Sequence, residues 1–197
     1  VKDAMQTNFS KRGDLGASVS IVHQNETVVD LWGGYADESQ SALWQQHSIV
    51  NVFSTTKTMA ALCLLMLHDR GKLDLFQPVC RYWPEFAEQG KKDILIAHIM
   101  SHSAGLSGLD QQVTESDLYS QDKMAGNLQE QKPWWQPGQA CGYHSVTQGF
   151  LQAELVRRVD GRTLGAFSSK KLRSRWKQSS LLGFQTSIWM LSSRYRQ

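Results

Sequence analysis

The chain has 197 residues, a length that suits one globular domain. A hydrophobic share of 41% excludes a disordered chain, and 15 Gly with 4 Pro in no period exclude a collagen-like one. The net charge of +3 conceals an asymmetry, because residues 168–197 carry +7 and residues 1–167 carry −4. Binding to nucleic acid or to a membrane surface through positive charge is therefore expected only of the last part of the chain.

The first part of the chain predicts a short helix followed by a β-hairpin. Met5 and Phe9 are four residues apart, which favours a helix with one apolar stripe. The runs 17–23 and 27–32 are β-branched and apolar, and the three residues between them suit a hairpin turn. The residues expected to face the core of this hairpin are Val19, Ile21, Val28 and Leu31.

A nine-residue apolar run at 59–67 predicts a buried helix that ends near Arg70, with Gly71 as its stop. Because the run contains no polar position, we expect this helix to be buried on most sides. The run is too short for a membrane span, which takes about 20 residues.

The second half predicts mostly helix and loop. Asp93 is expected to cap a helix over 94–100, and residues 107–132 are polar and weakly patterned. Residues 133–138 form an aromatic loop. A helix is predicted over 145–160, and it is followed by Gly161. Within that helix Glu154 and Arg158 pair at i,i+4, and another helix is expected to start near Leu164.

The cysteines and histidines predict no metal site. The three cysteines lack CxxC spacing, which excludes a zinc ribbon and suits buried thiols in a reducing compartment: Cys63, Cys80 and Cys141. His98 and His102 have the spacing of a helical metal pair but no third ligand. The first twelve residues are polar and show no signal peptide, so a cytoplasmic location is expected.

The strongest chemical signal is Ser54 followed three residues later by Lys57, at the front of the apolar helix. Positions i and i+3 share one face of a helix, so the lysine amine can reach the serine hydroxyl. A serine becomes a good nucleophile when a base takes its proton. Backbone N–H groups at the helix N-terminus can also stabilise a developing oxyanion. The plain alternative is a serine N-cap beside a lysine that extends to solvent.

The segment VFSTTK at 52–57 resembles the active-site serine motif of the serine β-lactamase and penicillin-binding-protein superfamily. Three further segments resemble its class C-like branch, which includes carboxylesterases. They are the strands over 16–37, the segment IMSHSAGL at 99–106, and Pro137-Gly138 followed by Tyr143-His144-Ser145.

The resemblance implies an α/β (α+β) fold of the β-lactamase/transpeptidase type, with an antiparallel sheet flanked by helices, an all-helical subdomain and an incomplete sheet. It implies that Ser54 is acylated, that Lys57 activates it and that Tyr143 is the second acid or base. It also assigns His102 to a structural turn. Ser145 stands where lactamases usually have Asn, which favours the esterase-like members.

The family-like domain is expected to cover residues 1–167, which is the N-terminal half of the family fold. The basic tail 168–197 does not resemble the family. It is expected to be an out-of-frame or disordered segment, or alternatively a basic arm that contacts phosphates or anionic lipid. No K-[ST]-G or H-x-G segment follows Tyr143, although the resemblance implies such a third motif.

We therefore expect a serine hydrolase that acts through an acyl-serine on small esters or amides, most simply a carboxylesterase. The alternative is an inactive truncated fragment that at most binds a partner. The expected partner is a small-molecule ester or amide, with no cofactor, no metal, no specific nucleic acid and no membrane span.

Overall fold

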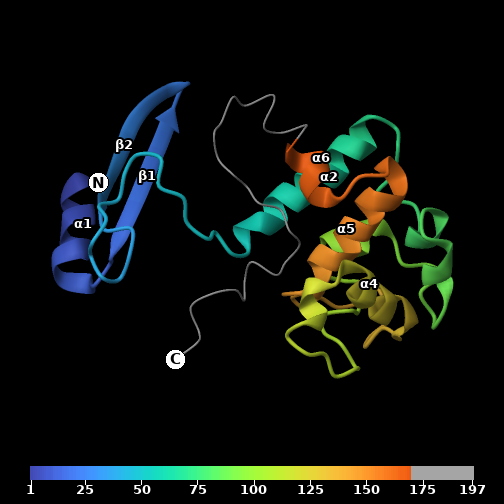
Figure 1. Cartoon of the computed structure of the whole chain (residues 1–197). Helices are drawn as coiled ribbons and strands as arrows, with labels where there is room; N and C mark the ends of the chain where they lie inside the picture. The colour runs from blue at the N-terminus through green and yellow to red at the C-terminus, as the bar shows by residue number, and fades with distance from the viewer. Residues whose placement is uncertain (170–197) are drawn as a thin grey trace. The chain divides into compact units, whose positions relative to one another are not determined.

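The computed structural model describes residues 1–169 and divides them into two compact units, the first over Val1–Val50 and the second from Asn51 onward (Figure 1). The predicted basic tail 168–197 lies, apart from its first two residues, outside the described residues. Within the described residues, no helix is long and apolar enough to cross a membrane.

The first unit contains the predicted helix and hairpin. Helix α1 spans Lys2–Thr7 and continues as a π-helix over Asn8–Arg12, and strands β1 (Gly16–His23) and β2 (Glu26–Gly34) pair antiparallel. The turn residues Gln24 and Asn25 both have positive φ, as a tight hairpin turn of the I′ kind requires. The hairpin prediction is confirmed.

The expected core face of the hairpin is only partly correct. Val19 and Leu31 lie opposite each other in the register and are half-buried, whereas Ile21 and Val28 are exposed by 40% and 55%. A register irregularity between Ile21 and Val22 interrupts the alternation of the two faces. Val28 also lies three residues from Leu31, so alternation places these two side chains on opposite faces of β2, and the half-buried neighbour of Leu31 on its own face is Val29.

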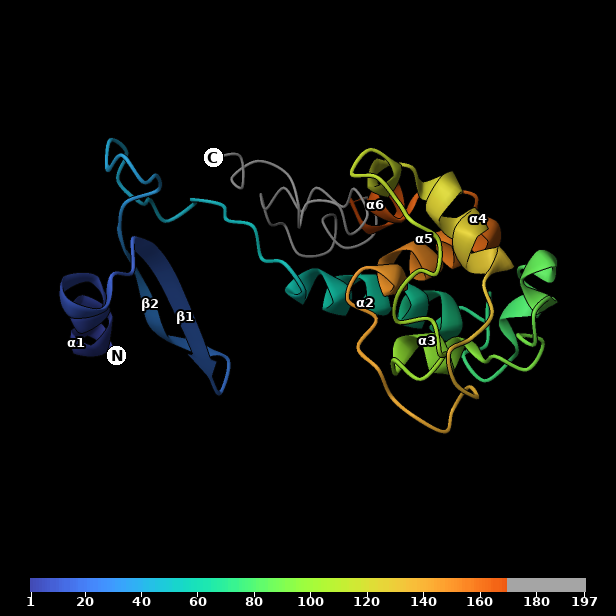
Figure 2. The ribbon, with the colours of Figure 1, turned by 90° about the horizontal axis from the view of Figure 1, so that it is seen from below.

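The second unit is helical, and its long helices are α2 (Thr55–Asp69), α4 (Gln121–Glu130) and α5 (Thr147–Asp160). Helix α5 packs against both α2 and α4, as Figures 1 and 2 show. The shorter helices are α3 (Ile96–Met100), α6 (Leu164–Ser168) and the 3₁₀ turns Val79–Arg81, Pro84–Ala87 and Asp117–Tyr119.

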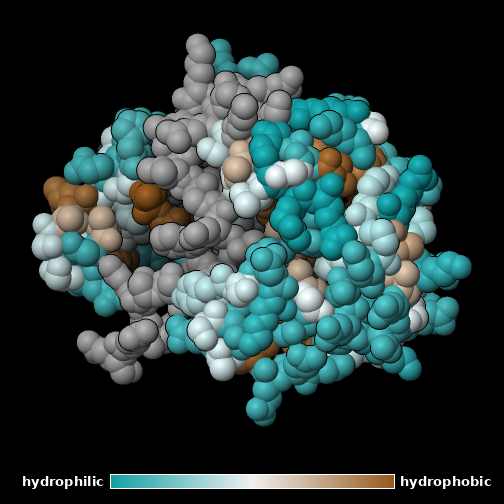
Figure 3. Space-filling model, turned by 45° about the vertical axis from the view of Figure 1, so that its right-hand side comes forward, coloured by the Kyte–Doolittle hydropathy of each residue, from teal (hydrophilic) through white to brown (hydrophobic). Residues whose placement is uncertain are grey.

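The core of this unit is apolar and dense. Its largest fully buried apolar side chains are Trp83, Phe86, Phe150, Phe167, Leu64, Leu67, Ile94, Ile96, Ile99, Leu106 and Met124. The face in Figure 3 shows mostly hydrophilic residues over the helices, with isolated hydrophobic ones between them. The helices therefore keep most of their apolar side chains inside the unit.

Three predictions for helices α5 and α6 are confirmed. Glu154 and Arg158 form the expected ion pair, with Arg158 Nε donating to Glu154 Oε1 at 2.6 Å. Gly161 follows α5 with φ 79°, a conformation that glycine adopts without steric cost. The Thr163 hydroxyl accepts from the Ala166 N–H and so caps α6 at Leu164.

Two helix predictions need correction. Helix α3 begins at Ile96 and not at Ile94, because the Ile94 carbonyl accepts from the Val79 N–H and Leu95 bridges to Pro78. Asp93 is therefore not its cap. The polar stretch 107–132 contains α4, which buries its apolar stripe against α5.

Helix α2 is also less enclosed than expected. Ala60, Cys63, Leu64 and Leu67 form a buried face, but Leu65 is 45% exposed. The prediction from the apolar run 59–67 that this helix is buried on most sides is therefore only partly correct.

This asymmetry of α2 gives a prediction with a matched control. Leu64→Ala leaves a cavity in the core and should lower the free energy of unfolding by about 2–5 kcal/mol. Leu65→Ala removes a half-exposed side chain from the same helix and should cost less than about 1 kcal/mol. Urea unfolding followed by circular dichroism measures both. Equal losses would contradict the described orientation of α2.

Candidate active site

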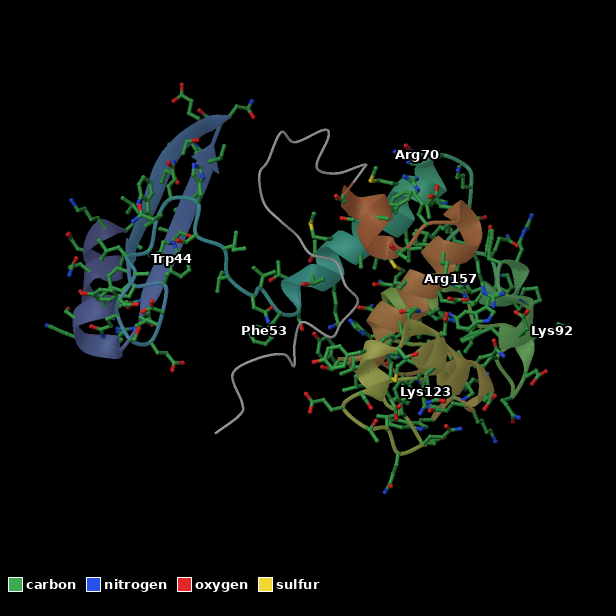
Figure 4. All side chains as sticks on the ribbon, viewed as in Figure 1. Trp44, Phe53, Arg70, Lys92, Lys123 and Arg157 are labelled. Atoms are coloured by element: carbon green, nitrogen blue, oxygen red, sulfur yellow. The ribbon has the colours of Figure 1, made fainter. Side chains whose placement is uncertain are left out.

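The site lies at the N-terminal end of α2. Ser54 is the N-cap residue, but its side chain makes no capping hydrogen bond. The hydroxyl is therefore not used in the way that the plain N-cap alternative requires. Phe53, labelled in Figure 4, precedes it with φ 45°, a strained conformation for a residue with a side chain. Such strain is concentrated at functional sites.

The three predicted site residues meet in space. The Tyr143 hydroxyl donates to Ser54 Oγ at 2.7 Å, across 89 positions of the sequence. Lys57 Nζ donates to Ser54 Oγ at 3.4 Å and lies 5.0 Å from the centre of the Tyr143 ring. A phenol and an amine thus both lie within hydrogen-bond distance of the serine oxygen.

Lys57 is held in place by the backbone of the Tyr143 segment. Its Nζ donates to the Ser145 carbonyl at 2.7 Å, which is the shortest of its hydrogen bonds. This acceptor belongs to the main chain and does not depend on the side chain at 145. The position of Lys57 is therefore compatible with Ser at 145.

The surroundings of Tyr143 make its hydroxyl more acidic than that of a free tyrosine. The pKa of Tyr143 is lowered, first by its hydrogen bond with Ser54 and then by the hydrogen bonding and charge of Lys57. Burial acts in the opposite direction but does not outweigh them, since half of the Tyr143 side chain is exposed. A lowered pKa raises the share of Tyr143 that is ionised near neutral pH, and the ionised phenolate is the form that can accept a proton.

The backbone N–H groups of the first helical turn are mostly engaged. The N–H groups of Thr55, Thr56 and Lys57 donate to the carbonyls of the residues three positions earlier, at 3.0–3.1 Å. The expectation of oxyanion stabilisation by the helix N-terminus therefore does not fit the N–H groups of Thr55, Thr56 and Lys57.

Sequence reasoning missed the contribution of two histidines. His102, which the resemblance assigned to a turn, contacts the Tyr143 ring, with ring centres 4.9 Å apart and ring planes tilted by 54°. His144 is fully buried beside it. His98 lies apart from them, and its Nδ1 accepts from the Leu95 N–H. The described residues contain no group of three or more side chains suited to hold a metal ion.

The chain is similar to the esterase/β-lactamase LipL of Mycobacterium tuberculosis, with 35% identity over 82% of this chain and 37% of the relative. It is similar to a family VIII carboxylesterase of known structure, with 42% identity and a TM-score of 0.81 over 86% of this chain and 47% of that one.

A penicillin-binding protein homologue from Caulobacter crescentus gives 37% identity and a TM-score of 0.84, over 88% of this chain and 47% of that one. The Beta-lactamase family model matches residues 3–178. The chain belongs to the Beta-lactamase family, and it spans less than half the length of these relatives. The resemblance and the fold class predicted from the sequence are confirmed.

The lowered pKa of Tyr143 can be measured directly. In a protein with ¹³C-labelled tyrosine rings, the Tyr143 hydroxyl should titrate below the ordinary value of 10.0. Lys57→Met removes the neighbouring positive charge, so the pKa of Tyr143 should rise in that variant. Lys123→Met, which removes a lysine paired with Asp117, is the control and should leave it unchanged. An unchanged pKa in Lys57→Met would exclude the described electrostatic coupling.

Proposed function

We propose that the protein is a serine hydrolase of the esterase/β-lactamase type, with Ser54 as the nucleophile. The observation that carries the proposal is the 2.7 Å hydrogen bond between Tyr143 Oη and Ser54 Oγ, with Lys57 Nζ 3.4 Å from the same oxygen. A nucleophile and its base within such a distance are the basic requirement of covalent catalysis by serine.

In the first step, the Tyr143 phenolate takes the proton of Ser54 as Oγ attacks the carbonyl carbon of an ester. The C–O bond to the leaving alcohol then breaks, and the alcohol oxygen takes the proton from Tyr143. Lys57 keeps its positive charge and stabilises the phenolate, since it donates to the Ser145 carbonyl and lies beside the ring. This assigns proton transfer to Tyr143 and charge stabilisation to Lys57.

In the second step, water attacks the acyl-serine. Tyr143 accepts a proton from that water, the acid is released, and the proton returns to Ser54 Oγ. Both half-reactions thus use the same pair of oxygens, and they need no metal or redox cofactor for their proton balance.

Small carboxylic esters are the proposed substrates, ahead of lactams and peptides. The relatives named as esterases support this choice, and so does Ser145 at the position where lactamases usually have Asn. The Tyr143 side chain is exposed by 54%, so a substrate can approach it from solvent.

The nucleophile is tested with a fluorophosphonate probe and a p-nitrophenyl ester. The full chain should be labelled at Ser54, and Ser54→Ala should lose both labelling and more than roughly 10³-fold in hydrolysis rate. Ser116→Ala, in an exposed turn of the same unit, should behave as the wild type. Absence of labelling in the wild type would contradict the proposal and favour an inactive, partner-binding chain.

Ser145→Asn tests the choice of substrate. Because Lys57 is bound by the main-chain carbonyl at 145, the variant should keep its catalytic geometry. The added amide should favour lactam recognition, so labelling by a fluorescent penicillin should rise relative to p-nitrophenyl ester hydrolysis. A ratio equal to that of the wild type would remove the argument from position 145.

A further inference from the structure

Two histidines enclose the backbone of Tyr143. His102 follows α3, and its ring centre lies 4.9 Å from that of Tyr143 and 5.5 Å from that of His144. His144 is the next residue after Tyr143, and it is fully buried and edge-on to Trp135. The described proton transfer in the proposed function makes no use of either ring.

Hydrogen bonds from the backbone fix the tautomer of each ring. The His144 N–H donates to His102 Nδ1 at 3.0 Å, and the Leu106 N–H donates to His144 Nε2 at 3.1 Å. An amide N–H can only donate, so both of these ring nitrogens must be unprotonated. The proton of His102 is therefore on Nε2. The proton of His144 is on Nδ1, where it donates to the Gly142 carbonyl at 2.6 Å.

These bonds hold the chain on both sides of Tyr143. Gly142 is bound through its carbonyl to His144 and through its N–H to the His102 carbonyl at 3.0 Å. A side chain at Gly142 would collide with the Trp135 ring, so the ring packs closely against this part of the backbone. Leu106 is itself bound to α5, because its carbonyl accepts from the Thr147 hydroxyl.

His102 occupies this position at a conformational cost. Its φ of 61° lies in the left-handed region, which residues with a side chain rarely adopt. Such a conformation persists where surrounding contacts determine it, and it is concentrated at functional sites. Here the surrounding contacts are the hydrogen bonds to Gly142 and His144.

We propose that His102 and His144 are positioning residues that hold Tyr143 against Ser54 only while both imidazole rings are neutral. The proposal rests on the proposed function for its catalytic consequence. A proton added to His102 Nδ1 would face the His144 N–H, and one added to His144 Nε2 would face the Leu106 N–H. In each case two donors oppose each other and a backbone hydrogen bond is lost.

The charges around the pair favour its neutral form. The pKa of His102 is lowered by burial and by the charge of Lys57 on α2. The pKa of His144 is lowered by burial and by His102, although its hydrogen bond to the Gly142 carbonyl acts in the opposite direction. In the described part of the chain these are the charged groups that act on the two rings, and Tyr143 is the other titratable group in contact.

Protonation in acid is expected to weaken this arrangement. The unfolded chain binds protons at these histidines below the ordinary pKa of 6.5, and the folded chain resists them. Stability and Tyr143 placement are therefore complete above that pH and decline as the pH falls below it.

Long-range ¹H–¹⁵N NMR of the full chain tests the pair without reference to activity. At about pH 7 we expect neutral rings, with the His102 proton on Nε2 and the His144 proton on Nδ1. The ring signals of ¹³C-labelled Tyr143 should move as either histidine becomes protonated in acid. A charged ring at about pH 7, or either opposite tautomer, would overturn the proposal.

Variants at His102 separate positioning from simple packing. Asn places an acceptor oxygen at the position of Nδ1 and tolerates positive φ, so His102→Asn should keep Ser54 labelling by fluorophosphonate and shift its acid decline to lower pH. His102→Leu lacks the acceptor and should lose about 100-fold in labelling rate at neutral pH, with a smaller difference in acid, where the wild type also loses this hydrogen bond. His98→Asn, outside the pair, is the control and should keep the wild-type profile.

The two proposals fail separately. The positioning role is supported if both rings are neutral with the stated tautomers and the Tyr143 signal changes as they are protonated. This holds even if Ser54 proves unreactive, because an unreactive Ser54 overturns only the hydrolase assignment. Labelling of His102→Leu at the wild-type rate, or of His102→Asn with the wild-type pH profile, would overturn the positioning role alone.

Discussion

The hydrogen bond between Tyr143 and Ser54 joins two segments that are 89 residues apart, and the site depends on this contact. It forms because α5, which follows Tyr143, packs against α2, which follows Ser54. The apolar core between these helices therefore fixes the distance between nucleophile and base. A change in that packing of one ångström, far from either oxygen, can cost about a hundredfold in rate.

The elements that are defined by local signals agree with the sequence. The hairpin, the end of α5 at Gly161 and the Thr163 cap depend on residues a few positions apart, and all three are present. Helix α4 was missed because its polar composition dominates the pattern. Its signals were Ser120 as N-cap, which accepts from the Lys123 N–H, and the apolar pair Met124 and Leu128 four apart.

The site was predictable where it follows from helix geometry or from the resemblance. The spacing of Ser54 and Lys57 gives their contact, and the motif around Tyr143 suggested the third residue. The Ser145 carbonyl as the acceptor for Lys57 was not predictable, since a main-chain acceptor leaves no mark on residue type. The same holds for the two histidines, whose ring nitrogens accept from backbone N–H groups of other segments.

Backbone groups, more than side chains, therefore determine how the site is held. The lysine is bound by a carbonyl, both imidazole rings by N–H groups, and Ser54 sits after a residue with positive φ. A side chain held by the backbone keeps its position when neighbouring side chains change. The side chain at position 145 can therefore change while the arrangement of Ser54, Lys57 and Tyr143 stays the same. Differences in substrate preference can arise at this position for that reason.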